Sequence, residues 1–402
     1  MSEDQMLRAG SRGPVIVVNV SRFRCDAIIV QEDHVRTLPL SDVTYKIIES
    51  KALEVRDPYI LIWLWNIIVG PVLEYLSFTD TPNTAKAWPH VWWIPTGPLV
   101  GFPLHAAGDH FGGQERTALD RVISSYSTSV HAILHARGAI REEGDGTSTS
   151  EFLLVSMTKT PGMKTLQYAA SEIDAVKLGC KSRGIDCTHA AGRYKDVLAA
   201  LNSGCKVFHF AGHGHTHSFD PLQSRLLLED WEDQSLTAGI LLEINLRETS
   251  PFLAYLSACG TSQILNYKSV DESIHLAGAF QLAGFRHVIG TLWEVEDSLC
   301  VNTAKMTYEG LWEKGMTDDS VCQSLHHTIR HLRDDWVHSH QMRNRSKISR
   351  SNVEQETVTQ LEEEVGMEAP FKLDGNGLTR DIRRRRPEVM RSWWVPYVHF
   401  GP

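Results

Sequence analysis

The chain lacks the features of a secreted, disulfide-linked protein and of a nucleic-acid binder. Its 402 residues include seven cysteines, scattered without C-x-x-C spacing, and this odd number fits reduced thiols better than a disulfide framework. The formal net charge of -9 opposes attraction to polyphosphate, and neither a zinc-finger spacing nor a basic patch interleaved with aromatic residues is visible. We therefore expect no nucleic-acid partner.

Long apolar runs are also missing. The most apolar stretch, residues 59–69 (YILIWLWNIIV), is about half as long as a bilayer-spanning helix, and Gly70 and Pro71 follow it at once. It predicts a buried helix and no membrane contact. Residues 1–14 contain acidic side chains and no apolar core, unlike a secretory signal peptide. These absences together predict a cytoplasmic protein.

What is present is the composition of a globular protein, 42% hydrophobic and 22% charged, in a chain long enough for two lobes or one enlarged α/β unit. Residues 15–30 hold two β-rich segments separated by a polar step and predict paired strands. Residues 53–76 carry apolar side chains at helical spacing, and residues 91–95 (VWWIP) predict a short buried strand.

Strand-like and helix-like patterns alternate after residue 150. This alternation predicts an α/β fold with a mainly parallel sheet and helices on both faces. The expected strands are residues 151–157, 206–214, 251–260 and 287–293, and the expected helices are residues 166–180, 196–204, 273–284 and 299–314.

The expected boundaries follow changes in composition. Residues 136–150 are rich in Gly, Ser, Thr and charge and predict a linker between a first lobe, residues 1–135, and a second lobe, residues 151–336. Residues 337–386 lose the apolar pattern and predict a charged, flexible insertion, either a solvated loop or a basic docking patch. Residues 387–402 are strand-like again and should return to the sheet.

Two of the expected strands end in small-residue turns that carry reactive side chains. One strand ends at His213-Gly214 and the other at Cys259-Gly260. Because ligands bind outside the carboxyl ends of parallel strands, both side chains should meet there. The thiolate is the reactive form of cysteine, so Cys259 would act as nucleophile after His213 takes its proton. The amides of Gly214 and Cys259 are suited to stabilise the resulting oxyanion.

A metal site is an alternative use of the same region, because four histidines lie close together in the sequence. They are His209, His213, His215 and His217. No carboxylate or cysteine nearby completes a usual zinc ligand set, so we expect no metal or other cofactor. On this interpretation His209 is a strand residue that orients the site or packs beneath it.

Simpler and rival interpretations of the strand ends stay open. A cysteine at a strand end is often a small core residue, and a single histidine is often structural. Ser257 would suit a serine hydrolase that uses the same crevice. It lies two residues before Cys259 in an expected strand, however, so it should point to the opposite end of the turn or into the sheet.

Three segments of the second lobe form a specific combination: HFAGHG (209–214), LSACGT (256–261) and DESIHLAGAFQLAGFRHVIGTLWEVED (271–297). Together with WWIPTGPLVGFPLHAAG, SSYSTSVHAIL and the terminal WWVPYVHFG, they resemble the CHAT peptidase family, relatives of caspases and of separase. The resemblance implies a caspase-like sandwich in which a degenerate, inactive first lobe packs against the active second lobe. It makes His213 the general base and Cys259 the nucleophile.

The resemblance also implies a substrate pocket. The block LWEVED is similar to the separase segment that lines the pocket for the residue before the cut, which places Asp297 and Glu294 there. Asp271, on the connection after the nucleophile, joins these candidates. A carboxylate in this pocket would favour Arg or Lys through a charge-assisted contact. Asp297 could instead cap the helix expected to begin near Ser298, and Asp271 could be part of a solvated helix start.

We therefore expect a cysteine endopeptidase that cleaves protein or peptide substrates, with a preference for a basic residue. The alternative is a catalytically silent caspase-like scaffold in a signalling or cell-death assembly. Many family members carry helical repeats ahead of this domain, and no periodicity of about 34 residues is visible here, so a regulatory protein partner would be supplied separately. Residues 218–239, between the two expected catalytic strands, are a candidate mobile loop in a latent precursor.

Overall fold

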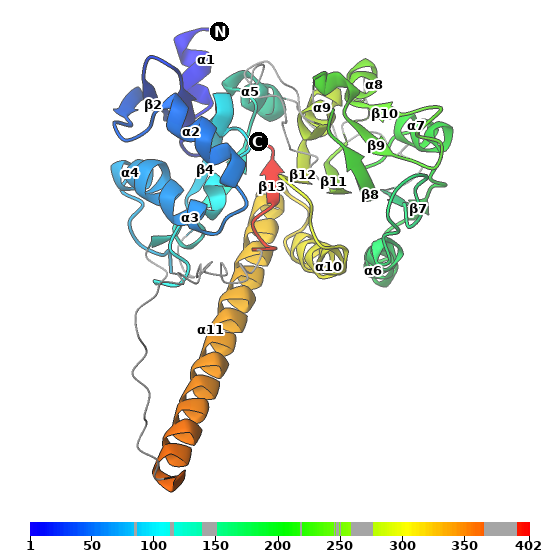
Figure 1. Ribbon diagram of the computed structural model, residues 1–402. Coiled ribbons are helices and arrows are strands. Elements are labelled where there is room, and N and C mark those ends of the chain that lie inside the picture. Colours follow the sequence, from blue (N-terminus) through cyan, green and yellow to red (C-terminus); the bar gives the residue numbers. More distant parts are fainter. Residues whose placement is uncertain are drawn as a thin grey trace.

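The computed structural model describes residues 1–83, 87–112, 116–138, 151–217, 219–244, 246, 249, 251–258, 276–365 and 392–402, with the backbone alone from residue 344 to residue 365. These residues form a mixed α/β structure with a central, mostly parallel sheet flanked by helices (Figure 1). The fold class that the sequence predicts is therefore confirmed.

The first part of the sheet comes from the N-terminal third of the chain. Its first two strands are the predicted pair and run antiparallel, with Val15 opposite Val30. A third strand adds antiparallel to the second, and two later strands add parallel on the other side. The elements are β1 (Val15–Val20), β2 (Cys25–Val30), β3 (Val35–Pro39), β4 (His90–Pro95) and β5 (Ile123–Tyr126), with helices α1 (Glu3–Arg8), α2 (Tyr45–Lys51) and α5 (Val130–Gly138).

The apolar run forms a buried helix, as predicted, and the helix continues past Gly70 within the region 53–76 that carries helical spacing. Helix α3 (Tyr59–Leu64) passes through a π turn (Trp65–Val69) directly into α4 (Gly70–Tyr75), and the Gly70 amide bonds to the Trp65 carbonyl oxygen. Because Pro71 has no amide proton to donate, this wider turn lets the helix continue past it. No helix in the described part of the chain is long and apolar enough to cross a membrane.

The second part of the sheet contains five strands that pair in parallel. They are β6 (Phe152–Ser156), β7 (Cys187–His189), β8 (Val207–His215), β11 (Leu253–Ala258) and β12 (His287–Thr291). The short strands β9 (Arg225–Leu227) and β10 (Leu236–Thr237) add antiparallel beside the end of β8.

Helices cover both faces of this second part. Successive residues of a strand point to opposite faces, so His209 and Phe208 of β8 mark the two sides. His209 contacts Tyr308 on the face covered by α6 (Ala169–Ser182) and α10 (Asp297–Glu313). Phe208 stacks on Phe280 of α9 (Leu276–Ala283) on the other face, where α9 packs beside α8 (Ala238–Glu243). Helix α7 (Tyr194–Asn202) precedes β8.

Strand β13 (Tyr397–Phe400) joins the two parts of the sheet. It lies between β12, to which it runs antiparallel, and β5, to which it runs parallel (Figure 1). The strand order is β10-β9-β8-β11-β12-β13-β5-β4-β1-β2-β3; β6 also pairs with β8, and β7 pairs with β6. The C-terminal segment is thus an internal strand of one continuous sheet.

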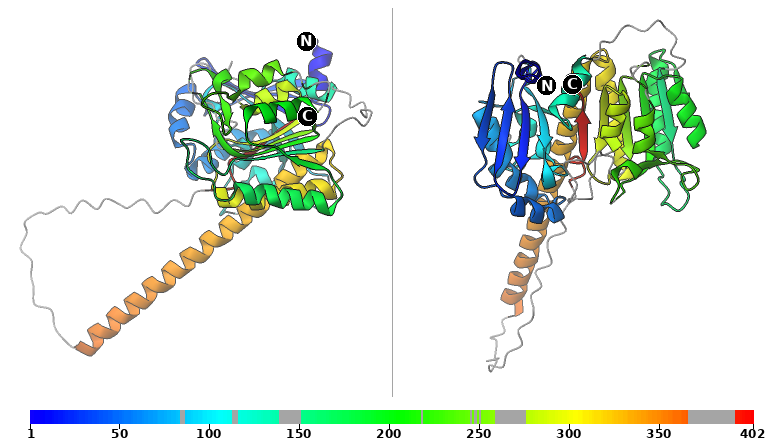
Figure 2. Two further views of the ribbon diagram at one scale, coloured as in Figure 1. Left: turned by 90° about the vertical axis from the view of Figure 1, so that its right-hand side faces the viewer. Right: turned by 90° about the horizontal axis from the view of Figure 1, so that it is seen from above.

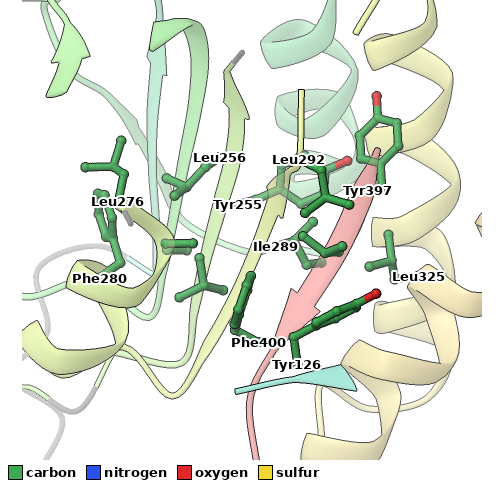
Figure 3. Packing of buried hydrophobic residues seen from close by; sticks show 14 of the residues in the cluster. Tyr126, Tyr255, Leu256, Leu276, Phe280, Ile289, Leu292, Leu325, Tyr397 and Phe400 are labelled. Carbon is green, nitrogen blue, oxygen red and sulfur yellow. The ribbon is translucent and has the colours of Figure 1, made fainter. Parts of the chain in front are cut away.

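The hydrophobic core is continuous across this junction. Figure 3 shows Phe400 of β13 beside Ile289 of β12 and Tyr126 of β5. The rings of Tyr126 and Phe400 are 5.9 Å apart, and both side chains are buried. Leu325 of α11 (Asp318–Val365) packs into the same cluster. The two parts of the sheet therefore share one core.

The charged segment after residue 337 differs from the flexible insertion that the sequence predicts. Residues 337–365 are helical and continue α11 away from the body of the protein (Figure 2), where the sequence predicts a flexible loop. Glu, Gln, Lys and Arg are good helix formers, so the loss of an apolar stripe removed the packing signal and not the helix. Residues 366–386 lie outside the described residues. So does most of the expected linker, whose first residues belong to α5.

Candidate active site

Strands β8 and β11 are neighbours and end at the same edge of the sheet. They pair in parallel from Leu253 opposite Val207 to Ala258 opposite Gly212. His213 comes directly after Gly212 in the sequence, and Cys259 directly after Ala258. Cys259 lies outside the described residues, so the distance between its sulfur and the imidazole of His213 stays a prediction.

His213 is held by a backbone carbonyl. His213 is 8% exposed, and its Nε2 lies 2.6 Å from the carbonyl oxygen of Lys164. A carbonyl oxygen only accepts hydrogen bonds, so Nε2 carries the proton. In the neutral ring Nδ1 is then the basic nitrogen, which is the form that a general base requires.

The loop that supplies this carbonyl connects β6 to α6 and is fixed by its own backbone. The Leu166 amide donates to the Thr158 carbonyl at 3.0 Å, and the Met163 amide donates to the Thr160 carbonyl at 3.1 Å. Gly162 has a φ of +70°, a conformation that glycine adopts without strain. The position of Lys164 therefore depends on a glycine turn two residues earlier.

A small pocket opens beside the ends of β8 and β11, on the face covered by α6 and α10. Small residues line much of it, namely Ala169 of α6, Ala211 and Gly212 of β8 and Ala258 of β11. Two of these residues directly precede His213 and Cys259 in the sequence. The pocket therefore reaches the residues that directly precede the predicted dyad.

A buried polar cluster forms one wall of this pocket. Glu172, in the first turn of α6, is 1% exposed and accepts hydrogen bonds from two sides. His209 Nε2 lies 3.0 Å from its Oε1, and the Ser257 hydroxyl donates to its Oε2 at 2.9 Å. On the other side of the His209 ring, Nδ1 lies 3.0 Å from the hydroxyl of Tyr308. His209 thus packs beneath the site, one of the two roles that the sequence suggests for it.

Glu172 is not among the site residues predicted from the sequence, although the sequence contains a signal for it. The buried positions of α6 are residues 169, 172, 173, 176 and 180, which is the spacing of an apolar helix face. Glu172 is the charged residue on that face. A carboxylate on a buried stripe, two helices before the histidine strand, indicates a buried polar contact.

The three carboxylates expected in the pocket have different positions. Asp297 lines the pocket, and its Oδ2 accepts a hydrogen bond from the Tyr168 amide at 2.8 Å. Tyr168 is the N-cap residue of α6, so Asp297 contacts the start of that helix; in its own helix, α10, the N-cap is Glu296. Glu294 is exposed and does not line the pocket. Asp271 lies outside the described residues.

Ser257 and Gly214 lie close in sequence to the two predicted catalytic residues. Ser257 faces the pocket and Glu172, and does not point away from it as the sequence suggests, because it occupies the same face of β11 as Tyr255. Gly214 lies beside His213 and opposite Leu226 of β9, and its role at an oxyanion stays a prediction. In the described parts of the chain no three His, Cys, Asp or Glu side chains are grouped so that they could hold a metal ion.

Comparisons with known proteins identify a family for this chain and some distantly similar structures. The sequence model of the CHAT domain matches residues 60–402 of this chain. No curated protein matches it. Among solved structures, Saccharomyces cerevisiae separase in complex with securin has a TM-score of 0.43 at 12% identity, and the match covers 62% of this chain and 15% of that chain. The Arg-specific cysteine proteinase gingipain R has a TM-score of 0.42 at 12% identity, with 82% of this chain and 74% of that chain covered.

Proposed function

Because the chain belongs to the CHAT domain family, we propose that it is a cysteine endopeptidase in which Cys259 and His213 form the catalytic dyad. The observation that carries this proposal is the shared end of β8 and β11, together with the carbonyl of Lys164 that holds the His213 ring. The match includes both strands.

In the proposed reaction, Nδ1 of His213 takes the thiol proton of Cys259. The thiolate attacks the peptide carbonyl carbon, and the amides of Gly214 and Cys259 stabilise the oxyanion. When the C–N bond breaks, the imidazolium returns the proton to the leaving amine. Water, deprotonated by His213, then hydrolyses the thioester and regenerates the thiol. The Lys164 carbonyl accepts the hydrogen bond from Nε2–H, so Nδ1 is the nitrogen left to exchange the proton with the thiol.

We also propose a preference for a basic residue before the scissile bond. Asp297 supports it, because its carboxylate lines the pocket beside the strand ends and retains one oxygen beyond the contact with Tyr168. Fluorogenic peptides test this preference. Cleavage after Asp or Leu, without cleavage after Arg or Lys, would contradict it.

Thiol labelling tests the dyad, because an activated thiolate reacts faster than the other cysteines. Burial raises the pKa of four of them to about 12: Cys180, Cys205, Cys300 and Cys322. With iodoacetamide at neutral pH we expect a fast phase of labelling that is lost in Cys259→Ala and slowed in His213→Ala. Equal labelling of the wild type and Cys259→Ala would favour a catalytically silent scaffold.

A further inference from the structure

Two cysteines lie where the end of helix α6 meets the sheet. Cys180 is near the end of α6 and is fully buried, and Cys187 is the first residue of β7 and is partly exposed. Both are free thiols in this structure. The chain returns sharply between them, because the Ile185 amide donates to the Cys180 carbonyl oxygen at 3.0 Å. Cys187 follows two residues after this hydrogen bond.

Both side chains belong to the face of the sheet that α6 and α10 cover. Cys180 continues the buried stripe of α6 about two helical turns after Glu172, which contacts β8 on that face. Cys187 pairs in parallel with Phe152, and residues opposite each other in a ladder share a face. The Phe152 ring lies 5.8 Å from the ring of Tyr308 in α10. Both thiols therefore lie in the interface between α6 and β7.

The properties of the two thiols differ. Burial, and after it the neighbouring Cys187 thiol, raise the pKa of Cys180 to about 12. A thiol of this kind is protonated at neutral pH and reacts slowly with dissolved reagents. Among the described strands β7 pairs only with β6, so its other edge is open. Cys187 is thus the thiol that a dissolved reagent reaches first.

We propose that Cys180 and Cys187 are a redox modification site, in which a small disulfide of the glutathione type converts the two thiols to a protein disulfide. The Cys187 thiolate attacks one sulfur of glutathione disulfide and releases a glutathione thiolate. Cys180 then attacks the Cys187 sulfur, and the second glutathione thiolate leaves. The protons of the two cysteines pass to the two glutathione thiolates, so two protein thiols are oxidised and one small disulfide is reduced.

The disulfide fixes α6 at the end opposite the candidate site. The first turn of α6 contains Ala169 and Glu172, which line the pocket, and the Tyr168 amide before it bonds to Asp297. In the reduced protein the other end is held by packing and by backbone hydrogen bonds of the turn. A covalent link to β7 slows the opening of that end, whether or not the chain is a peptidase.

Peptide mapping of the full chain in glutathione redox buffers tests the link. The Cys259→Ala variant is used, so that the predicted nucleophile does not consume the reagent. Trypsin cleaves after lysine and arginine, so Cys180 and Cys187 fall in separate peptides, residues 178–181 and 184–193. Oxidation should join these two peptides with the loss of two hydrogens, and dithiothreitol should release them.

Two single replacements separate the roles of the cysteines. In Cys180→Ser, Cys187 should keep the glutathione that it receives, because no second thiol displaces it. In Cys187→Ser, Cys180 should gain no glutathione and the joined peptides should be absent. Cys205→Ser is the matched control, since Cys205 is 5% exposed and burial also raises its pKa to about 12, and it should leave the link unchanged. Separate peptides at equilibrium with glutathione disulfide, with or without glutathione on Cys187, would overturn the inference.

Hydrogen exchange measured by mass spectrometry tests the consequence for α6. We expect the amides of residues 178–187 to exchange about tenfold more slowly in the oxidised protein than in the reduced protein. This difference should vanish in Cys187→Ser, which cannot form the link. Equal exchange rates in the linked and the reduced protein would refute the claim that the disulfide holds the end of α6.

Discussion

His399 of β13 and His287 of β12 bond to each other through their rings, with Nε2 of His399 3.0 Å from Nδ1 of His287. Both rings are buried, and they stack with centroids 5.2 Å apart. On one side, Nε2 of His287 bonds to Oδ1 of Asp318 at 3.0 Å. On the other, Nδ1 of His399 accepts from the Ser125 hydroxyl at 2.6 Å, and Ser125 accepts from Nε2 of His90 at 2.7 Å. This chain of hydrogen bonds crosses the junction between the two parts of the sheet.

The junction should be sensitive to acid. Burial lowers the pKa of His90 to about 3 and the pKa of His399 well below its usual range, so both are neutral in the folded protein. Each gains a proton near pH 6.5 only when unfolded, so the stability that they contribute is present above that pH and is lost as the pH falls toward the folded pKa. We expect the free energy of unfolding to fall by about 2 kcal/mol per histidine between pH 7 and pH 5.

Asp318 should also lower the free energy of unfolding as the pH falls, but over a lower pH range. Burial alone would raise its pKa, but hydrogen bonds from Arg286 and then His287 hold it below the usual range, so its contribution is lost below about pH 4. Urea denaturation at several pH values measures the total. Replacement of the exposed His131 by Gln should leave the profile unchanged, and a flat profile in the wild type would contradict the prediction.

The ion pair between Asp120 and Arg333 is a second structural link. Two guanidinium nitrogens of Arg333 bond to the two Asp120 oxygens at 2.7 and 2.9 Å, and both residues are buried. Asp120→Asn would remove the buried partner of Arg333, which would keep only its contact with the exposed Asp334, and would also remove the partner of Arg330. We expect it to destabilise the protein by about 3–5 kcal/mol in urea denaturation. Glu54→Gln, which breaks an exposed pair with Lys51, should cost less than about 1 kcal/mol. Equal effects would contradict this view.

Gly162 should matter for catalysis as well as stability. Alanine at its φ of +70° is strained by about 1–2 kcal/mol, and relief of that strain would move the Lys164 carbonyl away from His213. We expect Gly162→Ala to slow peptide cleavage and the fast phase of iodoacetamide labelling. Gly184 is a matched control, since its φ is +68° in the turn after α6. Gly184→Ala should lower thermal stability to a similar extent and leave both rates unchanged.

Phe400 should be among the stabilising residues of β13. It is 5% exposed and packs against Tyr126, so Phe400→Ala would leave a cavity that costs about 3–5 kcal/mol. Chemical denaturation measures this loss. Phe23→Ala is the control, because Phe23 is 98% exposed and its removal should have almost no effect. A loss at Phe400 no greater than at Phe23 would show that β13 contributes little to the junction.

The sequence predicts the strands of the candidate site well, because β8 and β11 are apolar runs that end in small residues, and such runs are local signals. It does not predict contacts between distant residues. The hydrogen bond from the Tyr168 amide to Asp297 joins positions 129 residues apart, and that between Ser257 and Glu172 joins positions 85 apart. Only the packing of α6 and α10 over one sheet face brings these residues together.

Helix α11 is a case in which a local element, and not a distant contact, was predicted wrongly. Its part after residue 337 lacks the apolar period that identifies a packed helix, so the sequence suggests a loop, whereas the composition alone favours a helix. The predicted orientation of Ser257 is also wrong. The face that Ser257 occupies is determined by the alternation of side chains along β11 and not by the turn that follows the strand.

The central place of β13 has a consequence for biosynthesis. A ribosome makes β5 and β12 long before residues 397–400 emerge, although these residues are the strand that lies between the two. A nascent chain therefore carries two unpaired strand edges, each exposed to wrong partners, until translation reaches β13. A ribosome that stalls shortly before this point should leave two incompletely joined halves, a form that chaperones and degradation enzymes can recognise.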